Sequence, residues 1–539
     1  MGFSLIPCAS MLGLMNHWFF HTYEPSSANI SFLILAIEPT ALLRLIGGPF
    51  SLTRLLGSYC AFLISLSLSI VVYRISPFHP LAQYPGPVMG KATRFWGLWK
   101  AYQGYKYLYR KQLHDIYGPY VRIGPNEISI NDAVAATQTL SRGGIDKGPY
   151  YTGSGKPSSI TPSILEITGE AHTTRRRGWN RALASVREYE PLLSKRVTEL
   201  VSLLEDNVET DLADWFYRFT VDVMGDLVYS GGFELMQNGD VTDLGGSIAR
   251  YMKISDLLGQ IPWSIDVLNS IPLLGRSFHG TTDYAKNLAI RRIKNGSGDL
   301  KDLYYHLASA DEGGHETKKP AQEIAAADSL TAIVAASDTS TTTMTSVVWF
   351  LLSHPAYYQR VQEELDRVIP SGDNLPDSDK QSHLHFVTAC INESLRLHPP
   401  LPSGGTRKVP MKAGGRSIAG RFVPEGTSIA IPCYSLHRNP EYFSYPDQFL
   451  PERWLPDSKL ERHNVSAFMP FSIGPATCAG QKFAKLELTM VLSALFRCFD
   501  LKFADGFDSE DWPRGMKDHF VVTRGPLHVR LTRRSNGYI

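Results

Sequence analysis

The longest uncharged apolar stretch of this chain begins shortly after residue 50. Residues 55–73 carry no charged side chain and are rich in Leu, Ile, Val and Ser. As a helix, these nineteen residues would cover the hydrocarbon layer of a bilayer, so they predict a transmembrane helix. The alternative is a buried core helix. A signal peptide would lie nearer the start, with basic residues ahead of a shorter apolar run.

The segments on either side of this stretch differ in character. Residues 1–54 are apolar but interrupted by charges, which favours one further span or an interfacial segment. Residues 74–87 contain four prolines, which cannot continue a helix. They predict a stiff, extended hinge. We therefore expect the folded body to occupy residues 88–539.

The periodicity of the body is mostly helical. Residues 324–353 form its longest helical pattern, and residues 355–368 and 385–397 are amphipathic. Residues 120–132 alternate like a hairpin, and residues 406–432 alternate like strands. This pattern predicts a mainly α protein with small β-sheets, in the α+β class.

Composition narrows the function. With 43% apolar and 20% charged residues the chain is an ordinary globular sequence, and its net charge of +2 gives no reason to expect nucleic-acid binding. No two of the six cysteines are separated by only two residues, as they would be in a zinc ribbon or a redox dithiol, so neither is expected. Sparse cysteines fit a reducing compartment.

One cysteine lies in an unusual setting. Cys478 belongs to a loop, residues 471–480, that is rich in Gly and Pro and is followed at once by a helical pattern. The start of a helix favours the thiolate, and a glycine-rich backbone can approach a flat ring. A thiolate presented in this way is a haem ligand. Taken alone, a buried inert thiol is the alternative.

Upstream, a basic helical segment and a small-residue notch offer further chemistry. His172 and Arg176 are four residues apart and share one helix face, which could bind carboxylates of a buried anion or simply be solvated. Within the long helix, Asp338 and Thr339 lie among small residues that leave room for a ligand. Such a pair can relay protons, although a tolerated polar turn is the alternative.

Glu393 and Arg396 are three residues apart on a predicted helix and can pair. Arg453 follows in the sequence FLPERW. A buried cluster of these three would be costly unless fully hydrogen-bonded, and would mainly fix geometry. A lone surface pair, the alternative, contributes little.

Four motifs in this order resemble those of the cytochrome P450 family of haem-thiolate monooxygenases. They are AASDTS (Ala335–Ser340), ESLR (Glu393–Arg396), PERW (Pro451–Trp454) and the cysteine loop (Phe471–Gly480). With the N-terminal apolar helix, the chain is similar to membrane-anchored microsomal members, and to those of fungal secondary metabolism. The resemblance implies the fold of that family and a haem cofactor.

The resemblance also implies a role for each matching residue. Cys478 looks like the axial iron ligand, and Phe471, Gly474 and Gly480 look like the residues that shield and shape its loop. His172, Arg176 and Arg407 match positions that contact haem propionates. Glu393, Arg396 and Arg453 resemble the structural triad behind the haem, and Asp338 with Thr339 resembles the pair that supplies protons during oxygen activation.

Three positions depart from the family pattern. Ala476 stands where Arg or His usually pairs with a propionate, which puts the anchoring of haem in question. Ala336 replaces a glycine of the long helix but is still small. Ser340 replaces a threonine and keeps its hydroxyl.

The expected activity is monooxygenation of a lipophilic small molecule, such as a terpenoid or polyketide. We expect substrate contacts from the loop over residues 140–165, the helical region 245–275, the small-residue notch of the long helix and Leu401–Gly405. The chain has no flavin or nicotinamide fingerprint, so the resemblance implies NADPH–cytochrome P450 reductase as electron donor. That partner implies the endoplasmic reticulum membrane with a cytosolic body. Two alternatives remain open: rearrangement or dehydration without external electrons, and a non-catalytic relative with impaired haem binding.

Overall fold

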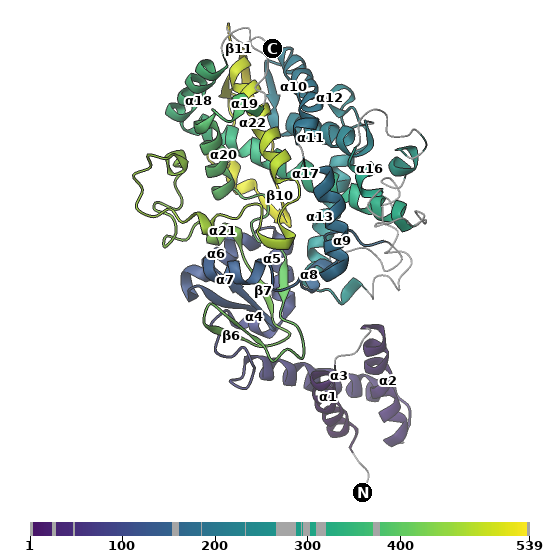
Figure 1. Ribbon diagram of the computed structural model, residues 1–539. Coiled ribbons are helices and arrows are strands. Elements are labelled where there is room, and N and C mark those ends of the chain that lie inside the picture. The colour runs from purple at the N-terminus through teal and green to yellow at the C-terminus, as the bar shows by residue number, and fades with distance from the viewer. Residues whose placement is uncertain are drawn as a thin grey trace.

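The computed structural model describes residues 4–23, 28–46, 49–153, 161–184, 186–231, 233–265, 287–292, 294, 302–308, 320–369 and 378–535. Figure 1 shows three N-terminal helices at one end of the molecule and a larger, mostly helical body at the other. The helices of the N-terminal part are α1 (Leu5–Thr22), α2 (Ala28–Ile46) and α3 (Leu52–Ile75). The predicted transmembrane stretch, residues 55–73, lies within α3.

The body contains helices of very different lengths. They are α4 (Val88–Ala92), α5 (Arg94–Gln103), α6 (Lys106–Tyr117), α7 (Ala133–Leu140), α8 (Pro149–Gly153), α9 (Gly169–Ala182), α10 (Glu190–Glu205), α11 (Leu212–Tyr229), α12 (Leu235–Asn238), α13 (Leu244–Gln260), α16 (Leu303–Ala308), α17 (Pro320–Ser353), α18 (Pro355–Val368), α19 (Ser378–Gln381), α20 (His385–Leu397), α21 (Cys433–Leu436) and α22 (Gln481–Cys498).

The long helix α17 runs through the centre of the body. It packs against α11, α16, α20 and α22 and against strand β10 (Val521–Thr523). Its small and apolar residues continue around the helix, which is the pattern of a helix buried on all sides. Met344 and Val348, for example, have no exposed surface. The long helix predicted over residues 324–353 is confirmed, with one extra turn at its N-terminus.

The strands form four small sheets, so the mainly α fold with small β-sheets is confirmed. Their orders are β1-β2-β7-β4, β3-β11-β8, β9-β10 and β5-β6. The remaining strands are β1 (Tyr120–Gly124), β2 (Glu127–Ile130), β3 (Glu209–Asp211), β4 (Thr406–Lys408), β5 (Arg416–Ile418), β6 (Arg421–Val423), β7 (Ser428–Ala430), β8 (Phe499–Phe503), β9 (Lys517–His519) and β11 (His528–Arg533). Antiparallel pairing of β1 with β2 confirms the predicted hairpin.

The segment between α3 and the body is compact. The backbone N–H of Ala82 donates to the carbonyl of His79 at 2.8 Å, and that of Tyr84 donates to Leu81 at 3.1 Å. Leu81 and Tyr84 are buried against the body, and the Tyr84 hydroxyl donates to the Phe422 carbonyl at 2.8 Å. Residues 77–84 therefore form turns where an extended hinge was expected, because Pro77 and Pro80 lie in turns and the apolar residues join the core, whereas residues 85–87 form no turn.

Two regions expected to contact a substrate are only partly covered by the structure. Helix α8 lies in the loop predicted over residues 140–165, but residues 154–160 are outside the described part of the chain. Helix α13 begins the predicted helical region 245–275, of which residues 266–275 are also outside it.

Candidate active site

A single large cavity brings most of the predicted site residues together. It measures about 410 Å³ and lies between α17, α22, α9 and the loop that carries Cys478. Each region expected to contact a substrate contributes to its wall, through Tyr150, Met252, Val334 and Leu401. Leu330, Phe520 and Val521 extend this apolar part of the wall.

The loop before α22 holds the Cys478 thiol at the cavity surface. The Cys478 N–H donates to the Phe471 carbonyl at 2.8 Å, which closes the loop on itself. Gly474 has a φ of +74°, and a Cβ there would lie 2.8 Å from the Cα of Ser141, so only glycine fits. Gly480 adjoins open space and ends the loop where α22 begins. Phe471 lines the cavity and packs against the core.

The electrostatic setting of Cys478 differs from the sequence-based expectation. Burial raises the pKa of the thiol, whereas the Gly480 N–H and the Arg176 guanidinium lower it less strongly. The thiol is exposed only toward the cavity, and protein surrounds its other sides. The helix start therefore favours the thiolate without producing it. A coordinated metal ion deprotonates such a thiol outright.

Three cations face the same cavity, and we call Lys147, Arg176 and Arg407 the cation cluster. Lys147 donates to the Ile164 carbonyl at 2.8 Å, and Arg176 donates to the Thr477 carbonyl at 2.7 Å. Within the part of the chain that the structure describes, no ion pair joins any member of the cluster to a carboxylate. The positive charge of this surface is therefore only partly offset, by the more distant carboxylates of Glu166 and Asp146.

Neighbouring ionisable groups respond to that charge. Burial, with Arg407 and Arg176 nearby, lowers the pKa of Lys147 to about 8. Burial, with the whole cation cluster nearby, lowers the pKa of His172 to about 4, so this histidine is neutral near pH 7. Like charges held together in this way bind a ligand that carries carboxylates.

Lys147 was missed by the sequence reading. It lies in a loop rich in Gly and Pro, and a lone lysine there carries no motif. His172 and Arg176 were found because helical spacing places both on one face of α9. Since Ala476 also lines the cavity, Lys147 contributes a cation to a site that lacks the arginine expected at that position.

These residues fit a haem. Cys478 can supply the axial sulfur, the cation cluster and His172 can hold the propionate carboxylates, and Gly474 lets the loop pack closely. When bound, haem supplies the activation of O₂, which no side chain can perform alone. The protein contributes the ligand, the anchoring charges and the shape of the cavity.

Helix α17 places its two predicted site residues differently. The Thr339 hydroxyl lines the cavity and donates to the Ala335 carbonyl at 2.7 Å, a bond that competes with the helix backbone. Asp338 is not part of the cavity wall and instead lies 3.6 Å from the Arg524 guanidinium. Burial raises the pKa of Asp338, and Arg524 opposes that effect. Adjacent helical residues point about 100° apart, which separates the two side chains.

A different carboxyl group, that of Glu487, faces the cavity beside Thr339. Glu487 of α22 accepts a hydrogen bond of 2.5 Å from the Ser340 hydroxyl, and both residues line the cavity. Burial raises the pKa of Glu487 to about 7, and the bond from Ser340 only partly offsets this. The sequence reading missed Glu487, because a glutamate within an apolar helix pattern does not reveal which side chains surround it.

The three residues of the predicted structural triad meet in the body. Arg396 binds Glu393 through two hydrogen bonds of 2.8 and 2.9 Å, and Arg453 donates to Glu393 at 3.0 Å. The Leu450 N–H and the Trp454 indole also donate to this carboxylate. All three charged side chains are fully buried. Nearly every lone pair of the carboxylate is used, whereas the buried Arg453 Nη1 has no hydrogen-bond partner among the described residues, so the cluster comes close to the condition for a tolerable buried ion pair without meeting it fully.

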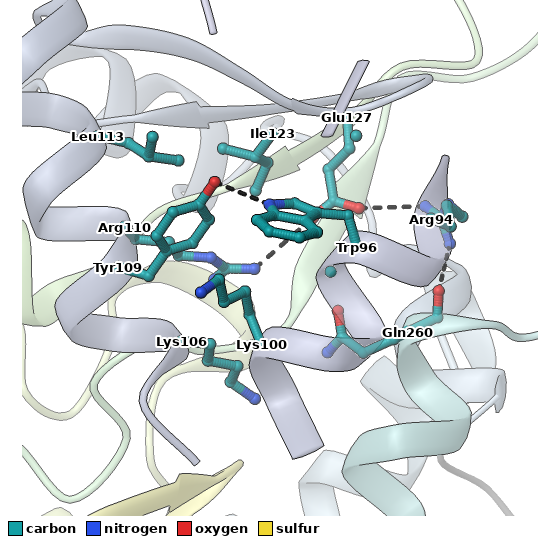
Figure 2. Close-up of a pocket in the computed structure, with 12 residues that line it drawn as sticks. Arg94, Trp96, Lys100, Lys106, Tyr109, Arg110, Leu113, Ile123, Glu127 and Gln260 are labelled. Atoms are coloured by element: carbon teal, nitrogen blue, oxygen red, sulfur yellow. Dashed lines mark hydrogen bonds and ion pairs between the residues drawn. The ribbon is translucent and has the colours of Figure 1, made fainter. Parts of the chain in front are cut away.

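A smaller pocket of about 40 Å³, between α5, α6 and β1, offers no comparable chemistry. Figure 2 shows that Arg94 and Arg110 both pair with Glu127. Glu127 lies 3.1 Å from Arg94 and 3.7 Å from Arg110, and Trp96 donates to the Tyr109 hydroxyl at 2.9 Å. The pocket lacks a nucleophile or a thiol. It lies where the N-terminal helices of the body meet the first sheet.

Cys478 faces a large apolar cavity, with the cation cluster beside it and the small-residue notch of α17 in the same cavity wall. This combination defines a haem-thiolate enzyme. The family model for cytochrome P450 matches residues 85–531, and the chain belongs to this family of monooxygenases. The family depends on redox partners for electrons and acts on lipophilic substrates. Helix α3 is the one helix among the described residues that is long and apolar enough to cross a membrane, which is compatible with an N-terminal anchor.

Curated relatives extend the comparison over most of the chain. The chain is 30% identical to Cytochrome P450 67 of Uromyces fabae, over 96% of this chain and 98% of the relative. It is 32% identical to Cytochrome P450 monooxygenase FCK2 of Fusarium pseudograminearum, over 88% and 85% of the two chains. It is 30% identical to Tryprostatin B 6-hydroxylase of Aspergillus fumigatus, over 88% and 84%.

Proposed function

We propose that this enzyme inserts one oxygen atom from O₂ into a lipophilic small molecule of secondary metabolism, by hydroxylation or epoxidation. The observation that carries the proposal is the shared cavity, in which Cys478 and the cation cluster lie below apolar residues such as Val334 and Phe520. The named activity of the tryprostatin relative, a hydroxylase, supports the reaction and the kind of metabolism.

Each part of the chain has a distinct task in this proposal. Cys478 holds the cofactor from one side, and the cation cluster with His172 fixes its orientation through the carboxylates. The apolar wall binds the substrate and excludes water. Thr339 and the Ser340–Glu487 pair hold protons next to the reacting centre, and Asp338 keeps its predicted part in proton supply from the side of α17 that faces Arg524.

The electrons come from NADPH–cytochrome P450 reductase in this proposal, at the endoplasmic reticulum membrane with the body in the cytosol. The lack of a flavin or nicotinamide fingerprint in the sequence supports a separate donor. The apolar helix α3 supports a membrane location shared with that donor.

A reduced, carbon-monoxide-bound absorption spectrum of the expressed enzyme tests the haem-thiolate centre. We expect the Soret band typical of thiolate ligation, and Cys478→Ala should abolish it. Cys433→Ala is the matched control, because Cys433 also borders the cavity but lies outside the loop before α22. Absence of the band in the unmodified enzyme would favour the non-catalytic alternative.

The reaction itself is tested by supplying reductase and NADPH. Monooxygenation consumes NADPH and gives a product heavier by one oxygen atom. Rearrangement or dehydration would proceed without NADPH and without added oxygen, so isotopically labelled O₂ in the product separates these hypotheses.

A further inference from the structure

The three N-terminal helices place polar residues inside and large apolar residues outside, the reverse of a soluble bundle. Side chains with more than half of their surface exposed include Met11, Trp18, Leu33 and Ile64. Of the eight buried positions in the described residues of these helices, only Leu43, Phe62 and Leu66 carry a large apolar side chain; the others are Ala9, Gly13, Asn16, Pro39 and Ser58. Bundles with small and polar interfaces and an apolar exterior are typical of helices surrounded by lipid.

Helices α1 and α3 run side by side in the same direction. His17 pairs with Ser69 at 2.7 Å and His21 pairs with Tyr73 at 2.9 Å, and both pairs are separated by 52 residues. One turn earlier, a Cβ added at Gly13 would collide with the Ser65 side chain, again 52 residues away, and would lie 2.6 Å from the Phe62 carbonyl. A constant separation along both helices means that they are parallel and in register.

Helix α2 follows α1 and precedes α3 in the sequence, and it runs in the opposite direction to both. The connections at residues 23–27 and 47–51 are short, which makes consecutive helices antiparallel. Ser58 donates to the Pro39 carbonyl at 3.2 Å, and Thr40 bonds Tyr59 at 2.8 Å. Asn16 of α1 donates to the Glu38 carboxylate of α2, so polar links join α2 to both neighbours.

We infer that α1, α2 and α3 all cross the bilayer, so that three spans rather than one anchor this enzyme and their outer surface is covered by lipid hydrocarbon. Parallel helices in register lie at the same depth, so if α3 crosses the membrane, α1 crosses it too. A chain can cross twice in one direction only by crossing back in between, which α2 does.

The lengths of the helices agree with this arrangement. The 18 residues of α1 span about 27 Å and the 19 residues of α2 about 28 Å. The hydrocarbon core of a bilayer is about 30 Å thick. Asn16 and Glu38 are polar residues within α1 and α2, and the hydrogen bond between them agrees with a lipid environment, where such groups are found paired with one another. Arg44 lies in the last turn of α2, where its side chain reaches the interface.

Topology mapping of the full chain in microsomes tests the inference. Ser26→Cys reports on the connection between α1 and α2, Ser51→Cys on the connection between α2 and α3, and Lys459→Cys on the exposed surface of the body. Each variant is treated with a membrane-impermeant maleimide before and after detergent. Labelling of the unmodified chain sets the background from its native cysteines.

Three spans place Cys at position 26 on the same side as the body and Cys at position 51 on the other side. Intact microsomes should then label the 26 and 459 variants fully, and the 51 variant at least ten-fold more after detergent than before. A single span places positions 26 and 51 together, opposite the body. A bundle lying on the surface leaves all three reactive in intact microsomes. Either of the last two patterns overturns the inference.

This comparison does not depend on which side the body faces, because only the relative sides of the three positions are compared. The variant at Lys459 reports the side of the body by itself, so a wrong cellular orientation and a wrong number of spans give different patterns. The reduced carbon-monoxide spectrum of each variant shows that its body has folded.

A native acceptor site gives a second readout. Asn29, Ile30 and Ser31 form an N-glycosylation sequence at the start of α2. With a cytosolic body, three spans keep this site away from the lumen, and we expect no change in mobility on endoglycosidase treatment. A glycan on Asn29 in a chain whose body labels from the cytosol contradicts three spans.

Discussion

At the scale of single residues, Ala476 stands where an arginine was expected, and we expect Lys147 to take over part of the anchoring of the cofactor. The Lys147 ammonium is held by the carbonyls of Ile164 and Ile167 and has no carboxylate partner among the described residues. A charge that is positioned but not neutralised is available to a ligand. The position of Lys147 in the cavity therefore gives a direct test of how haem is held.

Lys147→Ala should accelerate the transfer of haem to an apoglobin acceptor at least ten-fold, because a charge-assisted hydrogen bond contributes roughly 1.5–3 kcal/mol and each 1.4 kcal/mol corresponds to about a factor of ten. Lys408→Ala is the matched control, since Lys408 also lies on the sheet beside Arg407 but does not line the cavity. Adding Ala476→Arg should slow the transfer again. Equal rates in all variants would show that Lys147 does not hold the cofactor.

The contrast between Asp338 and Glu487 gives a second test at this scale. Thr339→Ala and Glu487→Gln should keep the thiolate Soret band but lower the product formed per NADPH at least ten-fold, because both side chains face the cavity. Asp338→Asn should lower it less, since Asp338 pairs with Arg524. The measurement is the ratio of product to NADPH consumed. A larger loss for Asp338→Asn than for Glu487→Gln would return the main role to Asp338.

Glu487 also makes stability depend on pH. Its pKa rises from 4.5 when unfolded to about 7 in the fold, so the folded protein binds more protons than the unfolded chain between these values. Stability should therefore fall as pH rises from about 4.5 to 7 and then level off. Glu487→Gln should remove this part of the slope and, above pH 7, raise the free energy of unfolding by roughly 3 kcal/mol.

Thermal unfolding midpoints of both proteins across this pH range provide the measurement. Glu461→Gln is the control, because Glu461 is exposed. Parallel pH profiles for the wild type and Glu487→Gln would mean that the carboxyl is not held in its neutral form.

At the scale of elements, the cluster at Glu393 ties α20 to the segment Pro451–Trp454. Its carboxylate accepts bonds from both arginines and from the Leu450 N–H, so α20 and the segment that begins at Leu450 meet at one group. Helix α20 is fixed at its other end too, where Glu364 of α18 accepts from the Phe386 N–H at 2.9 Å. Carboxylates at a helix N-terminus stabilise it. These contacts set the position of α20 behind the cavity.

Glu393→Gln should destabilise the enzyme by about 3–5 kcal/mol, because it leaves two buried guanidinium groups without their counter-charge. The expected result is little or no soluble haem-containing protein. Arg453→Lys keeps one charge and should lower the thermal midpoint while retaining the thiolate spectrum. A Glu393→Gln variant with an unchanged midpoint would show that the cluster is not needed for stability.

At the scale of the whole molecule, the docked connector makes the N-terminal helices and the body one continuous structure. Arg74, at the end of α3, donates to the Ala92 carbonyl of α4 at 2.9 Å. Leu81 and Tyr84 then pack in the hydrophobic core that also contains Ile128 and Ile429. The orientation of the body relative to the anchor is thus fixed by packing, which a flexible linker would not do.

Truncation tests this packing. A chain beginning at residue 76 should retain its haem, whereas one beginning at residue 88 loses two buried side chains worth roughly 2 kcal/mol each. Its thermal midpoint should fall by several degrees. Leu81→Ala in the longer chain should reproduce part of that loss. Equal midpoints for both truncated chains would show that the body begins at residue 88, as the prolines alone suggested.

The sequence by itself determined the class of fold, the long central helix, the cysteine loop and the residues of the structural triad. These features depend on local spacing: a 3.6-residue period, a glycine that needs positive φ at Gly474, and charges three residues apart on one helix. Local spacing is a property of the chain, so the residues carry it without their neighbours.

The tertiary structure alone decided which groups share a surface. Lys147, Glu487 and Arg524 come from segments far apart in the chain, and only packing shows that the first two face the cavity and the third pairs with Asp338. Packing also turned the proline-rich segment into docked turns and placed α1 parallel to α3. Long-range contacts and burial set these outcomes, and neither can be deduced from the spacing of residues in one segment.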